Sequence, residues 1–210
     1  EFSMRVALTL TKLSGNVSTL NPSEQNCKID RQGIIDWAGL EEFKNLRSLD
    51  ISDNFKQINN ELVLAKSVNL KMMDSLRWLN ADFTAIEKFD FSNKINFDAY
   101  IKDPLSENLE INLSDCKSCT VQIVGRDKLK SLKIISNGDL GEDSVEVSNL
   151  YALETINLSK FSNLEDFNFE KLDYVPLLKC IIISQIHLDN IDSYENISDQ
   201  LKSLFVLECN

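Results

Sequence analysis

The chain has 210 residues, 43% of them hydrophobic and 26% charged, so it can bury a sizeable core. Its 33 acidic and 22 basic residues give a net charge of -11, which argues against binding to nucleic acids or anionic membranes, because both require clustered Lys and Arg. No stretch reaches the roughly 18 uninterrupted apolar residues of a membrane-spanning helix, so no transmembrane segment is expected.

The N-terminal region, residues 1–37, is predicted to form a cap, and residues 38–210 to form one continuous domain of stacked coils. Residues 1–3 (Glu-Phe-Ser) precede Met4 and resemble a remnant of cloning. We therefore expect that an export signal or a lipobox cysteine upstream of Met4 has been removed.

One string of residues recurs three times without adjustment of its register. It reads L-x-x-L-x-I-x-x-N at Leu46–Asn54 and at Leu129–Asn137, and a third copy spans Leu201–Cys209. With weaker copies starting at residues 76, 108, 153 and 178, the successive spacings are 30, 32, 21, 24, 25 and 23. The alternating apolar positions predict short strands with one buried face, and stacked coils of this kind form a parallel sheet.

The spacings predict an α/β solenoid, namely a leucine-rich-repeat right-handed superhelix with a parallel concave β-sheet and an irregular convex side. The two long early spacings predict extra convex structure, with a helix within residues 56–75. The ninth position of each copy is expected to point inward, where an Asn amide would hydrogen-bond the backbone. Cys116 and Cys209 occupy that position in their copies, and the segment Ser159–Phe167 is interpreted as the return leg of one coil.

The run Ile34–Asn54, IIDWAGLEEFKNLRSLDISDN, resembles the first repeats of bacterial surface leucine-rich-repeat proteins. These are the internalin-like proteins and the related surface lipoproteins of Bacteroidetes. Beyond this run only the repeat skeleton is shared. The resemblance implies a secreted or surface-anchored protein that adheres to a ligand, often a host protein, and it brings no common catalytic site.

Cys116-Lys-Ser-Cys119 is a C-x-x-C motif, for which redox or zinc chemistry competes with a fortuitous pair of cysteines. Redox motifs of this type require a helix N-terminus, and a zinc site requires two further ligands, whereas His187 is the sole histidine. Asp50–Asn54 lacks the Gly and distal Glu of a calcium loop. We therefore expect no metal, no cofactor and no enzymatic activity.

The outward side chains of the concave sheet are expected to form a binding face for a protein or glycan ligand. Arg and aromatic side chains are frequent anchors of such faces. The apolar end of the face is either a binding patch or an edge against which a cap, further repeats or a second copy of the chain packs. The predicted binding residues are Asp50, Arg77, Trp78, Asn80, Asp82, Asn112, Lys133, Ile135, Asn157, Ile182 and Phe205.

Two functions stay open at this point. The resemblance favours an adhesive binding protein at the cell surface or outside the cell. Free cysteines and the lack of a visible export signal favour an intracellular adaptor or effector module that recruits proteins in the cytoplasm. A lipobox cysteine upstream of Met4 in the gene would exclude the adaptor.

Overall fold

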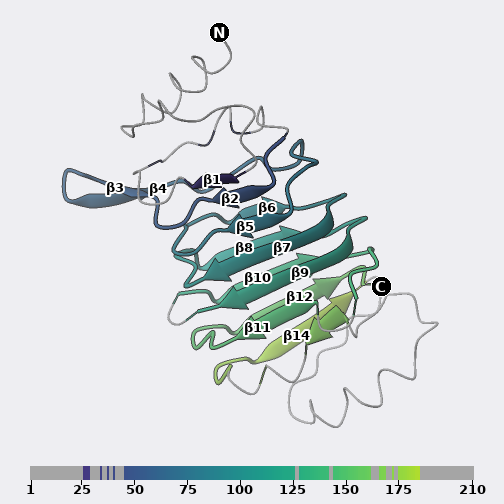
Figure 1. The fold of residues 1–210 in the computed structure, drawn as a ribbon. Helices are drawn as coiled ribbons and strands as arrows, with labels where there is room; N and C mark the ends of the chain where they lie inside the picture. The colour runs from purple at the N-terminus through teal and green to yellow at the C-terminus, as the bar shows by residue number, and fades with distance from the viewer. Residues whose placement is uncertain are drawn as a thin grey trace.

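The computed structural model describes residues 26–28, 34, 37, 40, 45–125, 128–141, 144–161, 166–168, 172 and 175–184. Within these ranges the regular elements are β-strands, and no α-helix is present (Figure 1). The described segments accordingly include no helix with the length and apolar character needed to cross a bilayer.

The strands form two parallel sheets that share the coils of a solenoid (Figure 1). From β5 onward the chain alternates between the sheets, so that each coil contributes one strand to each. Sheet A comprises β1 (Asn26–Lys28), β2 (Ser48–Asp50), β5 (Trp78–Asn80), β7 (Ile95–Lys102), β9 (Lys117–Val124), β11 (Val145–Ser148) and β13 (Phe167–Asn168). Sheet C comprises β6 (Lys88–Asp90), β8 (Asn108–Asn112), β10 (Ser131–Ile135), β12 (Thr155–Ser159) and β14 (Cys180–Ser184).

The core lies between the two sheets, because alternate side chains of every strand point inward. In sheet C the inward column runs through Phe89, Ile111, Ile134, Leu158 and Ile183, all almost completely buried. The Phe89 ring stacks on Phe91 at 5.3 Å between centroids. Burying a side chain of this size stabilises the fold by roughly 1.5–3 kcal/mol, so this column is a main source of stability.

Several strands in both sheets end in the same turn, in which an Asp or Asn side chain accepts a hydrogen bond from the backbone N–H two residues later. The residue after that donor has a positive φ, a conformation that turns the chain out of the strand. The turns are Asp50–Ser52 with Asp53, Asn80–Asp82 with Phe83, Asp90–Ser92 with Asn93, and Asn112–Ser114 with Asp115.

The predicted leucine-rich-repeat superhelix is wrong, because the return legs of the coils are strands of a second parallel sheet and the fold is a parallel β-solenoid. Copies of the repeated string form strands of both sheets. Copies starting at 46 and 76 lie in sheet A, whereas those starting at 129, 153 and 178 lie in sheet C. The long spacing between 76 and 108 therefore covers a change of sheet, with β6 and β7 between the two copies.

The copy placed at residue 108 was also two residues out of register. Leu132 pairs with Leu109, and Ile134 pairs with Ile111, so the inward positions of β8 are Leu109 and Ile111. The same pairing aligns Lys133 with Glu110, which places Glu110 on the outward side of sheet C.

The helix predicted within residues 56–75 is also wrong, because its first part forms an antiparallel hairpin of β3 (Phe55–Ile58) and β4 (Glu61–Leu64). The two turn residues, Asn59 and Asn60, have φ values of 51° and 65°. Two consecutive positive φ values are characteristic of the tight turns that match the twist of a hairpin, and Asn tolerates them well. The hairpin projects from the side of the solenoid (Figure 1).

Candidate binding faces

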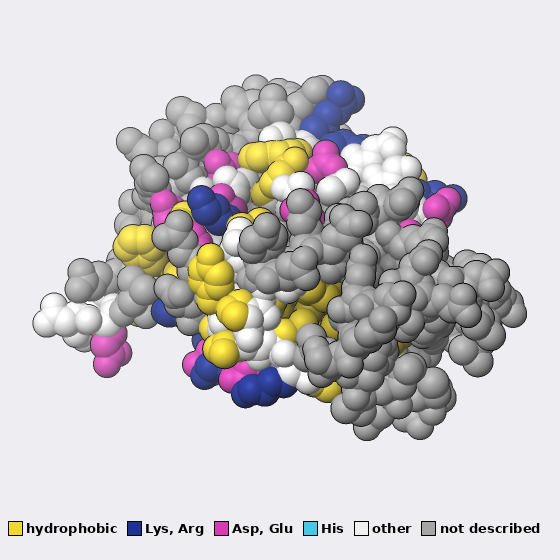
Figure 2. All heavy atoms as spheres, turned by 90° about the horizontal axis from the view of Figure 1, so that it is seen from below, with side chains coloured by type: hydrophobic (Ala, Val, Ile, Leu, Met, Phe, Trp, Pro, Cys, Tyr) yellow, Lys and Arg dark blue, Asp and Glu magenta, His cyan; other side chains and the backbone are white. Residues whose placement is uncertain are grey.

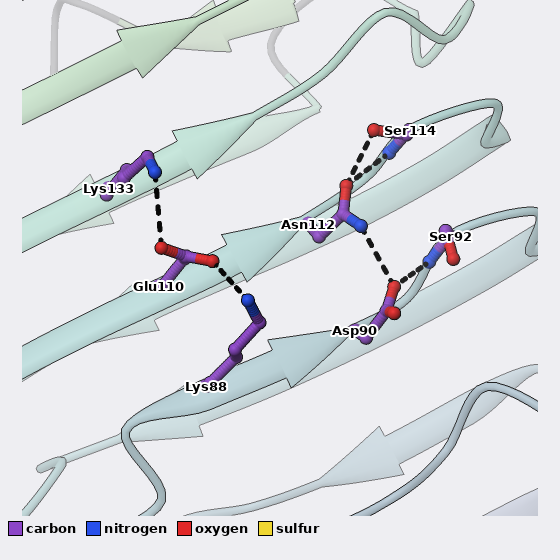
Figure 3. A network of polar contacts seen from close by, with 7 residues as sticks. All are labelled: Lys88, Asp90, Ser92, Glu110, Asn112, Ser114 and Lys133. Carbon is purple, nitrogen blue, oxygen red and sulfur yellow. Dashed lines mark hydrogen bonds and ion pairs between the residues drawn. The ribbon is translucent and has the colours of Figure 1, made fainter.

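The outward face of sheet C carries charges that pair between neighbouring coils (Figure 3). The Glu110 carboxylate on β8 receives Lys88 Nζ of β6 at 2.6 Å and Lys133 Nζ of β10 at 3.2 Å. The hydrogen bond from Lys88 is the main reason that the pKa of Glu110 lies below its ordinary value, and the Lys133 bond lowers it further. One carboxylate thereby connects three successive strands.

A second ladder runs beside the first, just before the strands of sheet C begin. Lys130 pairs with Glu107 at 2.9 Å, and Lys179 pairs with Glu154 at 2.7 Å, so the charge alternates from coil to coil. Each pair is exposed and adds little to stability by itself. Their alternation nevertheless favours one register of the coils and leaves this face with few charges available to a ligand.

The outward face of sheet A carries an aromatic pair beside a carboxylate. The Trp78 and Tyr100 rings lie on adjacent strands with centroids 6.1 Å apart and planes tilted by 43°. Asp98 is the register partner of Trp78 and precedes Tyr100 by two residues on β7, so its side chain shares the face of both rings. Tyr100 is 38% exposed, which is high for a large aromatic side chain on a sheet.

More carboxylates surround this cluster. Burial raises the pKa of Asp82, and the neighbouring charges of Asp50 and Asp103 raise it further, while a hydrogen bond from the Lys102 N–H opposes the rise. The ion pairs that join two described side chains all lie on the sheet C side of the solenoid. Among the described residues, neither Asp82 nor Asp98 forms an ion pair with another described side chain.

A shallow pocket of about 300 Å³ lies at the ends of the sheet A strands. Lys102, which lines the pocket, follows Tyr100 by two residues on the same side of β7. Tyr151 is 47% exposed and supplies an aromatic wall. Lys102 thus connects the pocket to the aromatic pair along β7. The pocket is lined by Lys102, Asp103, Val124, Gly125, Asn149 and Tyr151.

The residues predicted to form one binding face are divided between two faces of the solenoid, because the copies starting at 46 and 76 lie in sheet A and those starting at 108, 129, 153 and 178 lie in sheet C. Phe205 lies outside the described residues, as do His187 and Cys209. Asp50, Trp78 and Asn80 belong to sheet A, with Arg77 and Asp82 flanking β5, whereas Asn112, Lys133, Ile135, Asn157 and Ile182 belong to sheet C.

Two residues of the aromatic cluster, Asp98 and Tyr100, were missed because β7 contains no leucine-rich string. The alternation of Phe97, Ala99 and Ile101 was the available signal, since it predicts a strand whose intervening side chains point outward.

The predicted inward Asn is confirmed in sheet A but wrong in sheet C. Asn54 is buried, its Oδ1 accepts a hydrogen bond from the Ile34 N–H, and its Nδ2 donates to the Ile51 and Ser52 carbonyls. Asn137, at the same position of its string, is exposed and hydrogen-bonds Asp115 instead.

Cys116 is buried as expected, but it directly precedes β9 and does not end a repeat strand in the correct register. Cys119 is fully buried as well.

Seen from below, the described surface shows hydrophobic side chains in separate groups among acidic and basic ones (Figure 2). Comparisons with protein-family models, with curated proteins and with solved structures gave no match. The chemistry of the two faces is therefore the basis on which a function can be inferred.

Proposed function

We propose that the protein is a non-catalytic binding protein, and that the outward face of sheet A binds a protein ligand that presents a basic side chain. The observation that carries the proposal is the cluster of Trp78, Asp98 and Tyr100. It combines exposed aromatic surface with a carboxylate that has no ion-pair partner within the described part of the chain.

The chemistry of this cluster matches a guanidinium group. A cation placed over the face of Trp or Tyr is attracted by the ring, and the interaction strengthens as the group is desolvated. The Asp98 carboxylate can accept charge-assisted hydrogen bonds from the same group. The acidic residues around the cluster would also steer a basic ligand toward it, in keeping with the net charge of -11.

A glycan is the main alternative ligand, because aromatic rings and carboxylates also bind sugars. The two ligands differ in salt dependence: an ionic contact weakens as salt screens it, whereas stacking of a neutral sugar does not.

We further propose that the protein works at the cell surface or outside the cell. The resemblance of Ile34–Asn54 to surface repeat proteins supports this location, although the α/β superhelix of that family is not retained. The sequence of the gene upstream of Met4 tests this location. We expect it to encode a lipobox cysteine or an export signal, and a gene that encodes neither would contradict the proposal.

The binding proposal is tested by titrating the protein with an arginine-rich peptide and following tryptophan fluorescence. The chain has two Trp residues, and Trp37 is buried, so a change on binding would report mainly on Trp78. Because Trp78→Ala removes this reporter, the affinities of the variants are compared by isothermal titration calorimetry. We expect the affinity to fall about tenfold in Trp78→Ala and in Asp98→Asn, and to decrease with added salt.

Lys133→Ala is the matched control, because it changes a charge on the opposite face. It should bind the peptide like the unaltered protein. Equal affinity of all three variants, or stronger binding to a neutral oligosaccharide that is insensitive to salt, would contradict a cationic ligand at this cluster.

A further inference from the structure

Cys116 and Cys119 face the same buried space at the start of β9. In a regular strand, residues three apart point to opposite faces. Here Ser118 has a φ of 51°, which turns the backbone, so that Lys117 and Ser118 are exposed while both cysteines are completely buried. Both thiols are therefore enclosed in the core on the same side of the chain.

The preceding coil supplies the polar partners of both thiols. Cys116 Sγ donates to the Phe91 carbonyl at 2.9 Å, and Cys119 Sγ donates to the Lys94 carbonyl at 3.4 Å. Phe91 and Lys94 are held together by the hydrogen bond from the Lys94 N–H to the Phe91 carbonyl, at 3.2 Å. One tight turn therefore positions the two sulfur atoms side by side.

The following coil closes the space from the other side. A Cβ atom added to Gly138 would lie 2.3 Å from the Cys116 carbonyl oxygen, so the backbone of that coil is in direct contact with Cys116. The Lys94 ammonium is directed elsewhere, because its Nζ donates to the Leu70 and Lys71 carbonyls at 3.0 and 3.3 Å. In the folded coil, each of the two thiols is thus the nearest redox partner of the other among the described cysteines.

We propose that Cys116 and Cys119 are a cross-linking site that forms an intrachain disulfide by exchange with a small-molecule or protein disulfide. One thiolate attacks a sulfur of the external disulfide, forms a mixed disulfide and releases one external thiolate. The second cysteine then loses its proton and attacks the mixed disulfide, which releases the other external thiolate. The pair is oxidised by two electrons, and the external disulfide is reduced to two thiols.

The electrostatics of the closed coil distinguish the two thiols. The hydrogen bond with Cys116 is the main influence that lowers the pKa of Cys119, to about 7, although burial opposes it. The same hydrogen bond, together with burial, holds the pKa of Cys116 above its ordinary value. The nearest charges are Lys94, whose ammonium is directed away from the pair, and Asp98, whose side chain lies on the outward face of β7. Since both thiols are completely buried once the coil has closed, the first exchange must occur before closure, and either cysteine can be the attacking thiolate at that stage.

The test is to refold the full chain in a mixture of oxidised and reduced glutathione, block free thiols and digest with trypsin without reduction. Trypsin cleaves after Lys117, between the two cysteines, so the disulfide would join residues 103–117 to residues 118–126. We expect this linked pair to dominate, with a mass about 2 Da below the sum of the two free peptides. Recovery of both peptides as alkylated monomers would overturn the proposal.

Variants make the assignment specific. Cys116→Ser and Cys119→Ser should each abolish the linked pair, whereas Cys180→Ser should retain it. If either single variant fails to fold, the peptide map of the unaltered chain still decides the outcome. Linkage of Cys116 or Cys119 to Cys27, Cys180 or Cys209 as the main product would also overturn it. This result does not depend on the proposed ligand.

Discussion

The two sheets of the solenoid use the same inward pattern but differ in what they present outward. On sheet C, lysine and glutamate side chains alternate between coils and neutralise one another, as at Lys88, Glu110 and Lys133. On sheet A, an aromatic pair lies beside Asp98 in an acidic surrounding. On sheet C the side-chain charges pair across coils, whereas sheet A is the face for which we propose a ligand.

The largest expected effect concerns what the two faces share, namely the core. Phe89→Ala should lower the free energy of unfolding by about 3–5 kcal/mol, because a fully buried ring is replaced by a cavity that the stacked coils can refill only in part. Chemical denaturation monitored by circular dichroism measures it. A loss below about 1 kcal/mol would mean that Phe89 is not packed in a shared core.

The next largest loss of stability is expected to differ between equivalent positions in the two sheets. Asn54→Ala should cost about 1–3 kcal/mol, because the Ile34 N–H and the Ile51 carbonyl lose a buried partner. Asn137→Ala, at the same position of its string, is exposed and should cost less than about 0.5 kcal/mol. Equal losses in the two variants, measured by thermal unfolding, would remove this distinction between the sheets.

A smaller effect, dependent on pH, is expected on sheet C. Glu110→Gln should lower stability at neutral pH by about 1 kcal/mol or less, since the side chains concerned are partly exposed and screened. The folded protein lowers the pKa of Glu110, so its contribution is present above the pKa of the unfolded chain and is lost as pH falls through the folded value.

The difference between variant and unaltered protein should therefore be present at pH 7 and disappear in acid. Glu61→Gln, an exposed charge on the β3–β4 hairpin and outside the ladders, is the control and should show no such trend. A difference for Glu110→Gln that persisted below the folded pKa would show that the ladder is not its cause.

The smallest effect on stability is expected on sheet A. Asp98→Asn removes a carboxylate as Glu110→Gln does, but it should change the free energy of unfolding by less than about 0.5 kcal/mol while weakening the binding of a basic peptide. Calorimetric unfolding and titration on the same sample measure both quantities. A stability loss as large as that of Glu110→Gln would mean that Asp98 also has a structural role.

The repeated coil could be predicted from the sequence, but the second sheet could not. Leucine spacing identifies inward positions, and these are satisfied equally by Leu49 in sheet A and Leu132 in sheet C. The string does not say which sheet a copy joins, because strands of both sheets have the same inward pattern and several of them end in the same turn. The turn at Asp90–Asn93, before β7, had the same form as the one at Asp50–Asp53 and would have revealed the missed strand β6.

The candidate site was predicted in part for the same reason. Trp78 follows directly from the second copy of the string, whereas Tyr100 lies on a strand that the string does not mark. Their proximity is a property of the coil length between β5 and β7, which pairs Asn80 with Tyr100. Sequence periodicity alone does not fix that length when spacings vary.

The β3–β4 hairpin marks a place where residues can be inserted between two paired strands. Ser48 still pairs with Trp78 although the hairpin lies between them in the chain. The chain can therefore extend out of the solenoid at this point and return to it without changing the pairing of β2 with β5. The same site would accept an engineered loop, label or epitope, so that a new surface could be added to the molecule without altering either sheet.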